Sequence, residues 1–136
     1  MKSTIVIYEH EHEAGKIIAK RIAYYLGAQT TCTHHIERPI LEKVDNFILC
    51  LSPQSEGKLS EEWNDAIDEL TSHDLTGKTF AVYAENTDET KVLISPVINE
   101  VYRRLYHQNA RVVTCTDRQQ YSMAIDAWIC SISPNF

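Results

Sequence analysis

Short apolar runs alternate along the chain with longer stretches whose apolar residues recur at helical spacing. The strongest run is Asn46–Leu51, which is apolar at almost every position, as expected of a central parallel strand that is covered on both faces. Runs rich in β-branched and aromatic residues predict further strands, and a weaker run predicts one more. These further strands are expected over Thr4–Tyr8, Gln29–His34, Thr79–Tyr83 and Arg111–Thr116.

The stretches between these strands predict helices with one apolar face. Ser60 is a suitable N-cap for one helix, and Gly27 stands where another helix needs a left-handed C-terminal residue. Ser95 followed by Pro96 predicts the start of a third helix, because proline is tolerated at the first helical position. Helices are expected over Ala14–Leu26, Ser60–Ser72, Pro96–His107 and Tyr121–Ile132, with a helical turn at most in Ile36–Lys43.

Regular alternation of strands and helices predicts an α/β protein, a three-layer α/β/α sandwich around a five-stranded parallel sheet. At 136 residues the chain is expected to form a single domain, residues 1–136.

Composition narrows the classes of function. The formal net charge of −6 argues against binding to nucleic acid through a basic surface. No apolar run approaches the roughly 20 residues of a membrane-spanning helix, so we expect no membrane partner and a cytoplasmic location. The four cysteines contain no Cys-x-x-Cys pair, which favours reduced, buried thiols.

Three segments resemble the flavodoxin family, and the resemblance covers nearly the whole chain. The segment Ser52–Trp63 is similar to a strand-to-helix loop of that family, with Gly57, Glu61 and Glu62 in step. Asp74–Lys78 resembles the family turn before the fourth strand, and Ala124–Trp128 resembles the last helix. The resemblance implies the strand order 2-1-3-4-5, an FMN site at the carboxyl ends of the strands, and a role as a low-potential electron carrier.

The three loops that would hold FMN depart from the family pattern. Glu9–Lys16 offers no hydroxyl side chain for a phosphate and contains three carboxylates, which would repel it. No aromatic residue lies between Ser52 and Leu59, and Ala84–Thr90 has neither an aromatic residue nor a glycine. The sequence therefore predicts a flavodoxin-like, non-enzymatic binding module without a cofactor, which acts on another protein.

FMN binding is the alternative, with a redox protein as the partner. The candidate residues for a flavin would then be His10, Glu11, His12, Glu13, Gly15, Ser52, Pro53, Gln54, Ser55, Gly57, Ala84, Glu85 and Asn86.

Histidines after the first two strands suggest a third function. The carboxyl ends of neighbouring parallel strands meet at one edge of a sheet, and imidazole is a common ligand of Zn²⁺. The sequence therefore allows a metal-binding domain built on His10, His12, His34 and His35. Histidines among glutamates would also suit a pH-responsive domain.

Overall fold

The computed structural model describes residues 3–36, 38–51, 59–84, 91–113 and 125–136. Its strands are β1 (Thr4–Tyr8), β2 (Gln29–Cys32), β3 (Asn46–Leu51), β4 (Thr79–Ala84) and β5 (Arg111–Val113). Its helices are α1 (Glu13–Leu26), α2 (Arg38–Lys43), α3 (Glu61–Thr71), α4 (Lys91–His107) and α5 (Ile125–Ile132), with short 3-10 turns at Thr33–His35 and Ser133–Asn135.

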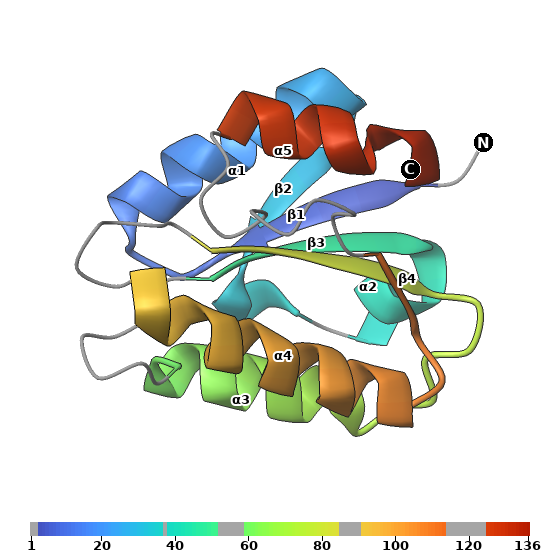
Figure 1. Cartoon of the computed structure of the whole chain (residues 1–136). Coiled ribbons are helices and arrows are strands. Elements are labelled where there is room, and N and C mark those ends of the chain that lie inside the picture. Colours follow the sequence, from blue (N-terminus) through green and yellow to red (C-terminus); the bar gives the residue numbers. More distant parts are fainter. Residues whose placement is uncertain (1–2, 37, 52–58, 85–90, 114–124) are drawn as a thin grey trace.

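The five strands form one parallel sheet in the order β2-β1-β3-β4-β5, as predicted. The helices α1 and α5 cover one face, and α3 and α4 cover the other (Figure 1). All six residues of β3 are buried. Alternate residues of this strand enter the two cores, because successive side chains of a strand point to opposite faces.

Each face of the sheet has its own core. On the α3 and α4 side, the rings of Phe47 and Phe80 stack with centroids 4.7 Å apart, and Trp63 is fully buried beside them. On the α1 and α5 side, Trp128 is buried and meets Tyr83 edge to face at 5.1 Å. Both tryptophans therefore belong to the packed interior.

Most predicted elements are confirmed, and the differences lie at their ends. Ser60 caps α3 by accepting a hydrogen bond from the backbone N–H of Trp63, and Gly27 ends α1 in the left-handed conformation, with φ of 64°. The prediction that a helix starts at Pro96 is wrong, since α4 begins at Lys91. A proline inside a helix costs a backbone hydrogen bond but does not forbid the helix, so Pro96 alone did not mark its start.

The second strand is shorter than predicted. The second strand ends at Cys32, because Thr33, His34 and His35 form a 3-10 turn. The last strand ends at Val113 in the described chain, and the rest of the predicted strand lies outside the described residues. The predicted start of the last helix also lies outside them, and α5 is described from Ile125. The segment expected to hold a helical turn contains the six-residue helix α2.

Tyr102 completes the hydrogen bonding between β4 and β5. Its buried hydroxyl accepts from the backbone N–H of Val82 at 3.1 Å and donates to the carbonyl of Val113 at 3.1 Å. The paired part of β4 against β5 ends at Ala81 and Val113, so this side chain bridges the two strands where the ladder stops.

Replacing Tyr102 with Phe should destabilise the fold, because two buried backbone groups would lose their partner. The expected loss is about 1–3 kcal/mol in the free energy of unfolding, measured by urea denaturation. Tyr106→Phe is the matched control, since Tyr106 lies one turn further along α4 and is 70% exposed. Equal stabilities of the two variants would contradict this role.

Asp74 joins the turn before β4 to the turn before β5. Its carboxylate accepts from the hydroxyl and the backbone N–H of Thr76, at 2.7 and 3.1 Å, and from the side-chain amide of Asn109 at 3.2 Å. These hydrogen bonds hold the pKa of Asp74 below its usual value. The bond from the Thr76 hydroxyl has the largest effect, followed by those from Asn109 and from the Thr76 N–H.

The stabilisation by Asp74 should therefore depend on pH. It is fully present above the ordinary aspartate pKa of about 3.9 and is lost as the pH falls through the lower folded-state pKa. Urea denaturation should give Asp74→Ala a lower free energy of unfolding than the natural chain at pH 7. This difference should shrink at the acidic end of the pH series, below about pH 3.9. A difference that stays constant down to that end would contradict the assignment.

Candidate functional site

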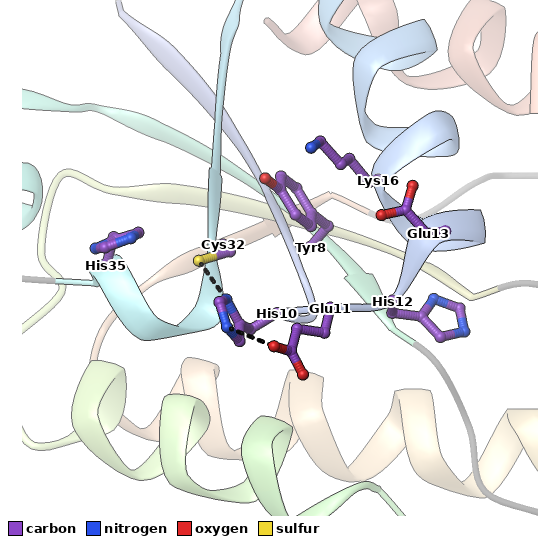
Figure 2. Close-up of a pocket in the computed structure, with 8 residues that line it drawn as sticks. All are labelled: Tyr8, His10, Glu11, His12, Glu13, Lys16, Cys32 and His35. Carbon is purple, nitrogen blue, oxygen red and sulfur yellow. Dashed lines mark hydrogen bonds and ion pairs between the residues drawn. The ribbon is translucent and has the colours of Figure 1, made fainter.

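The loop after β1 and the end of β2 form a pocket at the carboxyl edge of the sheet. Tyr8 ends β1 directly beside Cys32, which ends β2. The pocket has a volume of about 300 Å³ (Figure 2). Its lining is polar and holds charges of both signs, and consists of Tyr8, His10, Glu11, His12, Glu13, Lys16, Cys32 and His35.

The loop itself is a tight turn that leads into α1. The backbone N–H of His12 donates to the carbonyl of Glu9 at 3.1 Å, and Glu11 between them has a left-handed φ of 63°. A positive φ is uncommon for a residue with a side chain, and residues held in this way cluster at functional sites. The N–H of His10 donates to the hydroxyl of Thr33 at 3.1 Å, which ties this loop to the turn after β2.

His12 is the N-cap of α1. Its Nδ1 accepts from the backbone N–H of Gly15 at 2.9 Å. A Cβ on residue 15 would lie 2.7 Å from that nitrogen, so a glycine is needed for the cap to close. Gly15 therefore serves this cap through its own N–H and its lack of a side chain.

The cap makes a testable contribution to stability. His12→Ala should lower the free energy of unfolding by about 1 kcal/mol, because an N–H of the first turn loses its acceptor. His12→Asp should restore it, since aspartate is a strong N-cap and its charge suits the helix dipole. Urea denaturation of the three proteins at neutral pH measures this, and an Ala variant as stable as the natural chain would contradict the cap.

The three carboxylates of the loop do not all face the pocket. Glu9 is buried, with 8% of its surface exposed, and is absent from the pocket lining. One carboxylate oxygen of Glu11 lies 3.6 Å from Nε2 of His10, and this side chain is 84% exposed. Glu13 lies in the first turn of α1, where the helix dipole favours a negative charge.

The four histidines predicted as metal ligands lie near the same edge of the sheet, but they do not converge on one point. His10 and His34 stack with ring centroids 4.0 Å apart, and His34 forms an ion pair with Glu62 of α3. His12 and His35 lie on opposite sides of His10 in the pocket view (Figure 2). Within the described ranges, no three His, Cys, Asp or Glu residues are placed to hold one metal ion, so this geometry gives the metal hypothesis no support.

Six of the thirteen predicted flavin residues fall in the described chain. His10, Glu11, His12 and Glu13 line the pocket, Gly15 is in the first turn of α1, and Ala84 is the buried last residue of β4. The predicted residues that lie outside the described ranges are Ser52, Pro53, Gln54, Ser55, Gly57, Glu85 and Asn86.

Sequence reasoning missed Tyr8, Lys16 and Cys32 as lining residues of the pocket. Two of them could have been found from the strand pattern, because Tyr8 and Cys32 are the last residues of neighbouring parallel strands and such ends border ligand sites. Lys16 lies one turn into α1 and carried no such signal.

Solved structures with this architecture cover the whole chain. A flavodoxin of Fusobacterium nucleatum bound to flavin mononucleotide is 18% identical, with a TM-score of 0.76 over 100% of this chain and 99% of that one. The oxidised flavodoxin 2 of Bacillus cereus is 19% identical, with a TM-score of 0.74 over 98% and 99%. A short-chain flavodoxin associated with a bacterial microcompartment is 15% identical, with a TM-score of 0.75 over 99% of both chains.

The chain has the flavodoxin fold. No protein-family model and no curated protein sequence matches it. The described part of the chain contains no helix long and apolar enough to cross a membrane.

The prediction that the chain holds no cofactor is wrong on this comparison. A flavodoxin of nearly the same extent and fold is bound to FMN, which points to FMN rather than to no cofactor. The prediction rested on three loops that depart from the family pattern, two of which lie largely outside the described residues. In the first loop, Glu9 is buried and Glu11 lies against His10, so its three carboxylates do not act together as the prediction assumed.

Proposed function

We propose that this chain binds FMN at the carboxyl edge of its sheet and carries electrons to or from a redox partner protein. The observation that carries the proposal is the match along the full chain to a flavodoxin bound to FMN. In a parallel sheet of this order, ligands bind where the strand order reverses, which is between β1 and β3.

The described residues after β1 fit the phosphate of FMN. The N-terminus of the 14-residue helix α1 carries a partial positive charge and attracts an anion. The pocket lining brings together the ammonium group of Lys16, the hydroxyl of Tyr8 and the imidazoles of His10 and His12. The carboxylate of Glu13 also lines the pocket and offsets part of the positive charge at the start of α1. The exposed position of Glu11 beside His10 reduces the repulsion that its charge would cause.

Bound FMN would supply the redox chemistry, since a flavin takes up and releases electrons. The protein would orient the flavin and set its electrostatic surroundings. Lys16 and the first turn of α1 would hold the phosphate.

A partner protein would meet the chain at this same edge, where the flavin would be accessible. The net charge of −6 favours a partner with a basic surface, because opposite charges steer association at low ionic strength.

Titration of purified protein into FMN and into riboflavin, followed by quenching of flavin fluorescence, tests this function. FMN should bind with a micromolar or tighter dissociation constant. Riboflavin, which lacks the phosphate, should bind at least about tenfold more weakly, because a charge-assisted contact contributes about 1.5–3 kcal/mol.

Lys16→Gln should weaken FMN binding and leave riboflavin binding unchanged. Lys20→Gln is the matched control, because it makes the same change in charge one turn further along α1, at an exposed position. No quenching of either flavin would contradict the proposed function, and equal effects of the two lysine variants would contradict the phosphate position.

A further inference from the structure

The pocket contains a thiol next to an imidazole. Sγ of Cys32 lies 3.5 Å from Nδ1 of His10, although the two residues are 22 positions apart in the sequence. Only 5% of the surface of Cys32 is exposed, and it contributes to the lining of the pocket (Figure 2). A buried thiol that meets both a base and an open pocket has the arrangement of an activated nucleophile.

The position of His10 suits a base. Its Nε2 lies 3.6 Å from the carboxylate of Glu11, and this negative charge favours the tautomer with the proton on Nε2, which leaves the lone pair of Nδ1 facing the thiol. The ring is also held by the stacked His34 and by the hydrogen bond from the His10 backbone to Thr33. When His10 takes up the thiol proton, the Glu11 carboxylate stabilises the resulting positive charge.

Other ionisable groups surround the pair. The carboxylate of Glu62 is ion-paired with His34, and this offsets the charge that a protonated His34 would place against His10. The remaining ionisable side chains that line the pocket come from β1, α1 and the turn after β2, and are Tyr8, His12, Glu13, Lys16 and His35.

We propose that Cys32 and His10 form a site of thiol–disulfide exchange with small disulfides. In the reaction, the proton of Cys32 moves to Nδ1 of His10, and the thiolate attacks one sulfur of the disulfide. A new S–S bond forms between Cys32 and that sulfur, the original S–S bond breaks, and the departing thiolate takes the proton. The sulfur of Cys32 is oxidised into a mixed disulfide, which holds one half of the small disulfide on the protein. The other half is reduced and leaves as a free thiol.

The proposal is specific to Cys32 among the described cysteines. Cys50 is buried in the core, and burial raises the pKa of its thiol, which keeps it protonated and inert. Cys130 is exposed on α5 and serves as an ordinary thiol for comparison. The exchange requires no flavin, so it stands or fails separately from the proposed function.

The probe is cystamine, a small disulfide, added to the full chain at several pH values. After acid quenching, mass spectrometry of peptides gives the rate of adduct formation at each cysteine. In the natural chain, Cys32 should react at mildly acidic pH. In His10→Ala, this rate should fall at least about tenfold there and recover at alkaline pH, where a thiol ionises without a base.

His35→Ala is the matched control, since it removes another imidazole from the same pocket and should leave the Cys32 rate unchanged. The rate at Cys130 should be equal in all variants and serves as an internal standard. Reaction of the buried Cys50 would show that a variant has unfolded. If His10→Ala unfolds, His10→Gln takes its place, because glutamine keeps a polar side chain but is not a base. Equal Cys32 rates with and without His10 at mildly acidic pH, or an unmodified Cys32 while Cys130 reacts, would overturn the proposal.

Discussion

The burial of β3 on both faces is the constraint from which the rest of the structure follows. All six of its residues are inside, so both faces of the sheet have to be covered. In this chain helices cover both faces, and the neighbouring strands run parallel to one another. That arrangement brings the carboxyl ends of the strands to one edge. The loop after β1 and the end of β2 therefore meet there, and all residues that line the pocket come from segments next to this edge.

The positions of the charged side chains in the pocket decide how strongly the loop after β1 repels an anion. Three carboxylates in the sequence of the loop after β1 predict repulsion of an anion. In the fold, Glu9 is withdrawn into the protein and Glu11 turns toward His10. Glu13 lies against the positive end of α1, and Lys16 adds a positive charge to the same pocket. The distance and direction of each charge decide the sign of the field at the site, because electrostatic energy depends on separation and on exposure to water. The loop is thus compatible with the FMN found in a flavodoxin of the same fold.

The fold could be predicted from the sequence because local signals agreed with one another. The apolar run at β3, the cap at Ser60 and the glycine at position 27 each marked an element correctly. Pro96 misled, since its preference for a first turn is weaker than the tertiary packing that sustains α4. The pair of Cys32 and His10 could not be predicted, because it depends on the register of β1 against β2 and on a left-handed residue in the following turn.

The amide resonances of the labelled protein, recorded with and without FMN, decide whether the carboxyl edge of this sheet, around the loop after β1, is a flavin site. Binding at this edge should perturb the amides of residues that follow β1, β3 and β4, with His10, His12 and Gly15 among them. Perturbation confined to the opposite edge, near Asp45 and Arg111, or no perturbation at saturating FMN, would contradict it.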